Sequence, residues 1–229
     1  MSVRTSKITT ANTAALEGLP APSPSVVYRL VSALLVFPLF RLVFRGRTTG
    51  NTRVPMHGPL VVVANHGSHL DPPLLGHGLG RPVAFMAKAE LFRIPLLGRL
   101  IRACGAYPVN RGASDREAIR TATAKLQEDW AIGVFLDGTR QPDGRVNNPM
   151  PGAALLAARS GAPLLPVAIL NSHRALGSGQ TLPRLVPLFL RIGEPVPPPA
   201  SRRKPDLEAT TRELQRRINA MLDQGSVNT

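Results

Sequence analysis

The sequence contains few cysteines and few aromatic residues, and each scarcity excludes a kind of protein. Only one of its 229 residues is a cysteine, Cys104, so no intramolecular disulfide can form and a reducing compartment such as the cytosol is expected. Aromatic residues make up 4%, too few for the stacking platforms that bind single-stranded nucleic acid. A hydrophobic content of 43% excludes a disordered chain, and the length suits one well-buried domain.

Acidic residues are also scarce, with 14 Asp and Glu against 28 Lys and Arg and a formal net charge of +14. A chain this basic usually meets an anionic partner, which can be nucleic acid, an anionic membrane surface or a phosphorylated molecule. No basic block is typical of a groove-binding helix. We therefore expect no nucleic-acid partner, and we retain an anionic membrane surface and a phosphorylated substrate.

Long apolar runs are missing too. The most apolar stretch has an uncharged core only from Leu30 to Phe40, about half of the roughly 20 residues that span a bilayer as a helix. Arg29 and Arg41 bracket this core, and Pro38 should kink or split the helix. The residues that follow it do not resemble the cleavage site of a signal peptide.

These features predict a helical segment that lies in the membrane interface, with its arginines at anionic headgroups. A helix buried against the main domain is the alternative. The expected location is the cytoplasmic face of the cell membrane, as a peripheral or monotopic protein. The expected organisation is a flexible arm over residues 1–24, the membrane-interface segment over 25–47 and one α/β domain over 48–229.

From residue 59 onward, short apolar runs alternate with helical patterns. We predict strands over residues 60–65, 82–88, 105–110, 131–136, 163–170 and 186–193, and helices over 72–79, 94–104 and 152–161. The S-x-x-E pattern from Ser114 to Glu117 is a capping box that opens a further helix, and Pro205 opens a last one. Alternation of this kind predicts a single α/β domain with a mainly parallel sheet of six to seven strands, flanked by helices.

Polar side chains follow four of the predicted strands. His66 follows the first, Lys88 the second, Arg111 the third, and Asp137-Gly138-Thr139-Arg140 the fourth. Chemistry in such folds lies beyond the carboxyl ends of the strands, so we expect these residues to share one rim.

His66 and Asp71 stand five positions apart, where the first strand passes into a helix. A neutral imidazole accepts a proton near pH 7, and a carboxylate on its other nitrogen fixes the tautomer and stabilises the imidazolium. Because G-x-S-x-G is absent and Ser68 is too close in sequence to be a convincing nucleophile, the pair predicts a base that activates a substrate hydroxyl directly. A metal site that draws on His66, His69, Asp71 and His77 is the rival interpretation.

Five ordered blocks over about residues 55–200 resemble the glycerolipid acyltransferases typified by 1-acyl-sn-glycerol-3-phosphate acyltransferase. The blocks are NHGSHLD from Asn65, AKAELFRIPLLG, GAYPVNRG, FLDGTRQ and APLLPVAI. The resemblance implies His66 as catalytic base with Asp71 as its partner. It also implies acceptor-binding roles for Lys88, Arg111, Gly138, Thr139 and Arg140, and draws attention to Asn65, Ser68 and Asp137 beside them.

The implied reaction moves a fatty acyl group from acyl-CoA or acyl-carrier protein to a lysophospholipid acceptor, 1-acyl-sn-glycerol-3-phosphate, without a cofactor or a metal. Leu136-Asp137 replaces the family's Pro-Glu, and Pro108 stands where a bulky apolar residue is usual. Both departures lie near the implied acceptor site, so they bear on the identity of the acceptor more than on the acyl-transfer reaction. The alternatives are another lysolipid or glycolipid acceptor, a metal-dependent phosphoesterase that uses His66, His69 and Asp71, and a non-catalytic lipid-binding module.

Overall fold

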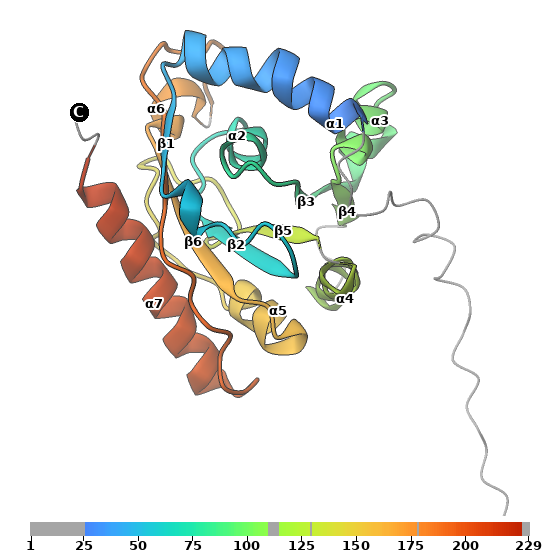
Figure 1. The fold of residues 1–229 in the computed structure, drawn as a ribbon, viewed down its shortest axis with the longest axis vertical. Coiled ribbons are helices and arrows are strands. Elements are labelled where there is room, and N and C mark those ends of the chain that lie inside the picture. Colours follow the sequence, from blue (N-terminus) through green and yellow to red (C-terminus); the bar gives the residue numbers. More distant parts are fainter. Residues whose placement is uncertain (1–25, 110–114, 129, 178, 226–229) are drawn as a thin grey trace, which may run out of the picture.

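A seven-stranded sheet forms the centre of the computed structural model, which describes residues 26–109, 115–128, 130–177 and 179–225 (Figure 1). The strand order is β1-β7-β6-β2-β5-β3-β4, and all neighbouring strands run parallel except β6 and β7. The predicted mainly parallel sheet is thereby confirmed. The strands are β1 (Arg47–Thr49), β2 (Leu60–Ala64), β3 (Val83–Lys88), β4 (Tyr107–Val109), β5 (Ala131–Phe135), β6 (Leu164–Leu170) and β7 (Phe189–Ile192).

Helices cover both faces of this sheet. Figure 1 shows α1 and α2 on one side of the sheet and α4, α5 and α7 on the other. The α-helices are α1 (Val26–Val31), α2 (Asp71–Gly78), α3 (Leu97–Ala103), α4 (Asp115–Gln127), α5 (Gly152–Ser160), α6 (Ser172–Leu176) and α7 (Lys204–Asp223). Two π-helical segments, η2 (Ser32–Val36) and η3 (Leu39–Val43), extend α1, and two short 3-10 helices are η4 (Asn51–Arg53) and η5 (Ala89–Arg93).

The apolar strands divide their side chains between two cores. In β2 every residue is buried, and Val61 and Val63 pack toward α4, α5 and α7 while Val62 and Ala64 pack toward α2 and the N-terminal helix. Strand side chains alternate between the two faces of a sheet, so a strand covered on both sides must be apolar throughout. This explains why the run before His66 shows no polar alternation.

The N-terminal helix is exposed along most of its length and buried near its end. Its helical residues run without a break from Val26 to Val43, which is long and apolar enough to cross a membrane by length and composition. Only 11% of this stretch is buried, so it is not an ordinary core helix. Phe40 and the following Phe44 nevertheless lie in the core beside α2.

Pro38 does not split this helix. The N–H of Phe37 donates to the carbonyl of Ser32 and the N–H of Phe44 to the carbonyl of Leu39, which is the wider π-helical pattern on both sides of the proline. A proline removes one i→i−4 hydrogen bond and clashes with that carbonyl, and the shift to the π-helical pattern accommodates the change.

Several short elements, β1 and α6 among them, were not predicted from the sequence. Sequence patterns gave no sign of β1 or α6, because three and five residues are too few to show a period. The predicted flexible arm, Ser114 of the capping box and Arg111 lie outside the described residues.

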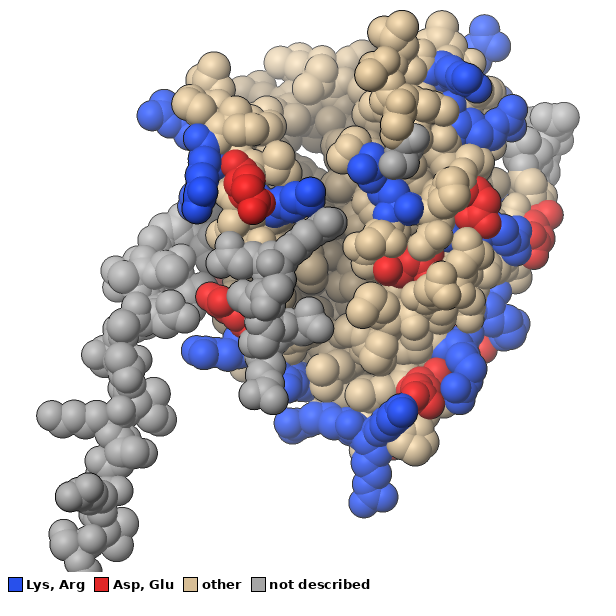
Figure 2. Space-filling view, turned by 180° about the vertical axis from the view of Figure 1, so that it is seen from behind, with Lys and Arg blue, Asp and Glu red and all other residues tan. Residues whose placement is uncertain are grey.

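Figure 2 shows Lys and Arg beside Asp and Glu along the side where α7 runs, and α7 carries several Glu–Arg and Glu–Lys pairs.

Candidate active site

His66 and Asp71 meet where β2 ends and α2 begins. The Nδ1 atom of His66 lies 2.8 Å from Oδ2 of Asp71, and the backbone N–H groups of Gly67 and Ser68 donate to the same oxygen, each at 2.8 Å. Asp71 is fully buried at the first turn of α2, where a negative charge is favoured by the helix dipole. Because the loop from His66 to Asp71 is short, two backbone N–H groups and one ring nitrogen all bond to a single oxygen of the Asp71 carboxylate.

This geometry fixes which nitrogen of His66 can accept a proton. An ionised carboxylate is an acceptor only, so Nδ1 carries the proton that bonds to Asp71 and Nε2 has the free lone pair. The His66 side chain is 16% exposed, which leaves part of the ring accessible from the rim. His66 is thus held in the tautomer of a general base.

Phe135, the last residue of β5, holds the imidazole from one side. The two rings are stacked with centroids 3.9 Å apart and an interplanar angle of 11°. Phe85 of β3 stacks on Phe135 at 5.7 Å, so an aromatic row runs from His66 across two neighbouring strands. Sequence reasoning missed Phe135 because its role depends on β5 pairing beside β2.

Asn65 and Ser68 hold the loop in place. The buried side chain of Asn65 donates to the carbonyls of Gly144 (2.7 Å) and Ile169 (2.9 Å) and accepts from the N–H of Ile169 (2.8 Å). It therefore fastens the end of β2 to β6 and to the loop after β5. Ser68 is fully buried, and its hydroxyl accepts from the N–H of Leu70.

The segment from Asp137 to Arg140 forms a turn beyond β5. Asp137 is buried, and its carboxylate accepts from the N–H groups of Asn147 (3.2 Å) and Asn148 (2.8 Å). Burial raises the pKa of Asp137, and those two hydrogen bonds oppose the rise. The shorter acid in place of the family's glutamate thus anchors the loop beneath the turn.

Gly138 has a structural task in this turn. Its φ of 66° is left-handed, and its N–H donates to the carbonyl of Phe135 at 3.0 Å. That hydrogen bond and the left-handed φ show that Gly138 shapes the turn; its predicted contact with a phosphate stays a prediction. Thr139 is exposed and Arg140 is half-buried beside it.

Lys88 and Arg140 follow different strands, and the charge of each lowers the pKa of the same histidine, His69. The pKa of His69 is lowered chiefly by burial and then by the positive charge of Arg140, with a smaller contribution from Lys88. His66 lowers it as well, whereas Asp71 raises it. The structure therefore brings together at one rim the His–Asp pair and two of the three predicted cations; Arg111 lies outside the described residues.

A second histidine packs behind the loop. A side chain on Gly67 would place its Cβ 2.7 Å from Cβ of His173, and one on Gly144 would meet the His173 ring. Burial is the main cause that lowers the pKa of His173, which favours the neutral ring. No local pattern in the sequence singles out His173, and only the folded chain shows it beside the loop that carries His66.

The metal interpretation finds no support in the described ranges. Within them, no three His, Cys, Asp or Glu side chains converge as ligands for an ion. His77 is remote from Asp71, at the other end of α2, where its Nδ1 lies 3.0 Å from the Ser32 hydroxyl.

Fold and site together define an α/β domain with a histidine–aspartate dyad at the carboxyl edge of a mainly parallel sheet. Comparison with known families agrees with this class: the model of the family described as Acyltransferase matches residues 45–170, more than half of the chain. The chain belongs to the Acyltransferase family. The resemblance of the five sequence blocks is thereby confirmed.

Several relatives share this domain. The chain is 32% identical over 163 residues to a probable 1-acyl-sn-glycerol-3-phosphate acyltransferase of Mycoplasma genitalium, covering 68% of this chain and 59% of that protein. It is 31% identical over 145 residues to the 1-acyl-sn-glycerol-3-phosphate acyltransferase of Bacillus subtilis, covering 62% and 69%. The chain spans about half the length of several other curated relatives, between 42% and 51%.

A solved structure has the same fold. The crystal structure of the 1-acyl-sn-glycerophosphate (LPA) acyltransferase PlsC from Thermotoga maritima superposes with a TM-score of 0.74 at 26% identity. The superposition covers 88% of this chain and 81% of that one, so it includes most of the α/β domain.

Proposed function

We propose that this protein is an O-acyltransferase in which His66 is the general base. Nε2 of His66 takes the proton from an acceptor hydroxyl while the oxygen attacks the carbonyl carbon of a fatty acyl thioester. The carbon–sulfur bond then breaks, and the thiolate leaves with the proton that the imidazolium returns. The observation that carries this proposal is the contact of His66 Nδ1 with the buried Asp71, which leaves Nε2 free.

Direct transfer fits the surroundings of His66 better than a covalent acyl-enzyme. Ser68, the nearest hydroxyl in sequence, is fully buried and its Oγ already accepts a hydrogen bond from Leu70. A nucleophilic serine must present its oxygen to the substrate within reach of the base. The acceptor hydroxyl is therefore the nucleophile, and either acyl-CoA or acyl-carrier protein supplies the thioester.

The proposed acceptor is 1-acyl-sn-glycerol-3-phosphate, and the product is phosphatidic acid for phospholipid synthesis. The charges of Arg140 and Lys88 both lower the pKa of His69, which supports an anion-binding site on the rim that carries His66. A phosphomonoester carries close to two negative charges near neutral pH, and a guanidinium binds it in a bidentate manner. Arg111 and Thr139 are proposed to complete the phosphate site.

A lipid acceptor requires contact with a membrane, and the N-terminal helix is the proposed contact. Leu30, Leu34, Leu35 and Leu42 are all exposed on it, while Phe40 on another face is buried. An exposed apolar stripe with flanking arginines suits a helix that lies at an anionic membrane surface. We propose a peripheral or monotopic placement on the cytoplasmic face.

Thioester consumption with a panel of acceptors tests the function. The wild-type chain should release CoA when given acyl-CoA with 1-acyl-sn-glycerol-3-phosphate, and a chelator should leave the rate unchanged. His66→Ala should keep the fold and lose turnover, whereas His57→Ala, an exposed loop histidine, should match the wild type. A folded His66→Ala variant with near wild-type CoA release would refute the proposal, and chelator sensitivity would favour the metal-dependent phosphoesterase.

A further inference from the structure

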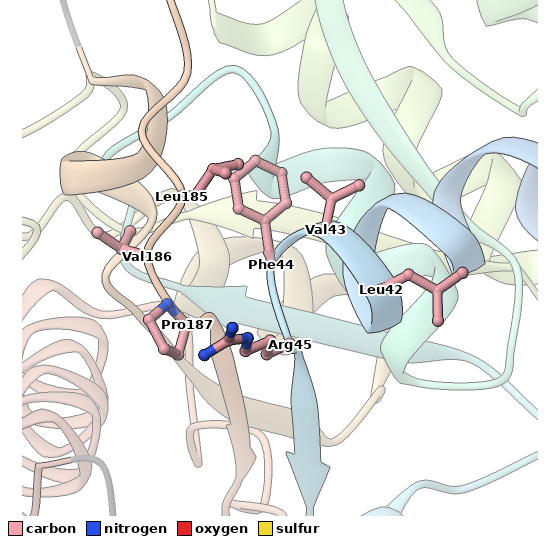
Figure 3. A pocket seen from close by; sticks show the side chains of 7 residues that line it. All are labelled: Leu42, Val43, Phe44, Arg45, Leu185, Val186 and Pro187. Atoms are coloured by element: carbon pink, nitrogen blue, oxygen red, sulfur yellow. The ribbon is translucent and has the colours of Figure 1, made fainter.

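A groove of about 380 Å³ lies where the N-terminal helix ends (Figure 3). One wall is formed by residues 42–45, at the end of the helix, and the other by residues 185–187, in the loop before β7. Its lining is apolar except for Arg45. Figure 3 shows Leu185 beside Phe44, and Phe44 is almost fully buried, so Phe44 forms the floor.

Backbone hydrogen bonds join the two walls at the base. The N–H of Leu188 donates to the carbonyl of Phe44 (3.1 Å), and the N–H of Arg47 donates to the carbonyl of Leu188 (3.0 Å). The side chain of Asn171 also donates to the carbonyl of Pro187 (2.8 Å). The groove is therefore a built part of the fold.

Sheet topology puts this groove on the same edge as His66. β7 is antiparallel to β6, and β1 is parallel to β7, so the amino ends of β1 and β7 lie beside the carboxyl ends of β6 and β2. Phe189 at the start of β7 pairs with Leu170 at the end of β6. With strands about 4.8 Å apart, β1 stands roughly 14 Å from β2 along that edge. The groove is thus near the candidate active site and separate from it.

Of the described residues that line the groove, Arg45 alone is charged, and its backbone is strained. Its φ is 46°, a left-handed conformation that is costly for a side chain with a Cβ. Among the described residues its guanidinium forms neither a hydrogen bond nor an ion pair, whereas the neighbouring Arg41 donates to the carbonyl of Gly46. Figure 3 shows the Arg45 side chain directed toward Pro187.

The two stretches of chain that form the walls of the groove carry no acidic residue. No Asp or Glu occurs between residues 26 and 70 or between residues 144 and 193, the two stretches that supply both walls. Leu42 and Leu185 at the two walls are each 74% exposed, and Leu182 in the same loop is 78% exposed. The mouth of the groove therefore continues the apolar surface of the helix and adds an unpaired cation to it.

We propose that this groove binds one anionic phospholipid of the membrane surface. An acyl chain lies against Phe44, Leu185 and Val186, and the headgroup phosphate bonds to Arg45. The ligand must be both apolar and anionic, because the lining is apolar and its single charge is an unpaired guanidinium. The proposal rests on the membrane contact proposed above, and the site is distinct from the acceptor site at Lys88 and Arg140.

Photo-cross-linking of lipids tests the site. Trace phosphatidylglycerol or phosphatidylcholine, each with a diazirine on one acyl chain, is added to vesicles of one fixed composition, so that recruitment of the protein does not change between probes. Labelled peptides are then mapped by mass spectrometry. We expect labelling at residues 42–45 and 185–187, with the anionic probe favoured by about fivefold, since one arginine near a membrane surface contributes about 1 kcal/mol.

Four variants make the outcome decisive. Arg45→Gln should remove the preference for the anionic probe, and Arg159→Gln, the same charge change at an exposed arginine of α5, should retain it. Arg45→Gly relieves the left-handed strain, so it should melt no lower than the wild type and still lose the preference, which separates binding from folding. His66→Ala should label like the wild type, so failure of acyl transfer would not be confused with failure of this site.

Two outcomes would overturn the proposal: equal labelling by both probes, and labelling that is spread evenly along the helix and unchanged in Arg45→Gln. Either would show that the probes report only the lipids that surround the helix and not a lipid bound in the groove. Absence of labelling with either probe would overturn it as well.

Discussion

Replacing Asp71 by asparagine tests how the dyad works, because the change removes a charge and almost no volume. One carboxylate oxygen of Asp71 receives three hydrogen bonds, from His66 Nδ1 and from the N–H groups of Gly67 and Ser68. The other oxygen is buried and has no hydrogen-bond partner among the described residues. An asparagine can therefore be placed in two ways, with its amide oxygen or its NH2 group toward the three donors.

The two placements differ strongly in energy. With the amide oxygen toward the donors, all three hydrogen bonds remain and only the buried NH2 group lacks a partner, at a cost of about 1–3 kcal/mol. The reverse placement leaves three donors unsatisfied. We therefore expect Asp71→Asn to keep His66 in the correct tautomer, with the free energy of unfolding lowered by about 1–3 kcal/mol.

This placement sets the expected loss of activity. Where an asparagine can turn its amide toward the imidazole, the wrong tautomer costs about ten-thousandfold in turnover. Here the backbone N–H groups of Gly67 and Ser68 hold the oxygen in place, so only the stabilisation of the imidazolium is lost. Turnover of Asp71→Asn should fall by about a hundredfold, near the lower limit for general-base assistance.

The assay is CoA release at saturating acceptor, with chemical denaturation of each variant as the measure of folding. Asp71→Ala leaves the three donors unsatisfied and should be both less stable and less active than Asp71→Asn. A folded Asp71→Asn protein with unchanged turnover would show that the carboxylate does not assist His66. A loss as large as ten-thousandfold would show that the backbone donors do not fix the amide.

Three further predictions follow from particular side chains. Lys125 is buried and, among the residues that the structure describes, has no hydrogen-bond partner; it lies 4.6 Å over the Trp130 ring, and burial lowers its pKa. Lys125→Met should therefore raise the free energy of unfolding by about 1 kcal/mol or more at pH 7. The ammonium group of Lys125 keeps its proton up to about pH 10.5 in the unfolded chain and loses it at a lower pH in the folded chain, so the wild type gains stability as the pH rises. The difference in free energy of unfolding between Lys125→Met and the wild type should therefore shrink toward pH 10.5, and a difference that does not change with pH would refute this. Arg140→Ala should raise the half-saturating concentration of 1-acyl-sn-glycerol-3-phosphate about ten- to hundredfold and leave that of an uncharged monoacylglycerol unchanged, and equal losses would mean that Arg140 does not bind phosphate. Leu34→Ser with Leu42→Ser should weaken co-sedimentation with anionic vesicles without lowering the melting temperature, because both side chains are exposed, and unchanged co-sedimentation would place the membrane contact elsewhere.

Deletion of residues 25–47 would be a poor test of the proposed membrane contact. Removing residues 25–47 would take away Phe40 and Phe44, which belong to the core beside α2, together with the first residue of β1. Loss of folding would then be expected whether or not the helix binds a membrane. Substitutions on its exposed face are the sharper experiment.

Local patterns in the sequence were enough to predict the sheet, the dyad and the rim. Short continuous apolar runs such as Leu60–Ala64, alternating with helical patterns, indicate strands buried on both faces, and such strands are typical of a mainly parallel sheet between helices. Because parallel strands end at the same edge, the positions of His66, Lys88 and Arg140 followed from their places after the runs. These features depend on local periodicity and on a general rule of topology, and both can be read from one chain.

The residues that surround the dyad are known from the folded chain alone. Phe135 stacks on His66 because β5 pairs with β2, and the two strands are about 70 residues apart in sequence. The groove at Arg45 exists because β7 reverses direction and brings the end of the N-terminal helix to the edge that holds His66. Strand order and direction depend on contacts between distant residues, which no local pattern of polar and apolar residues records.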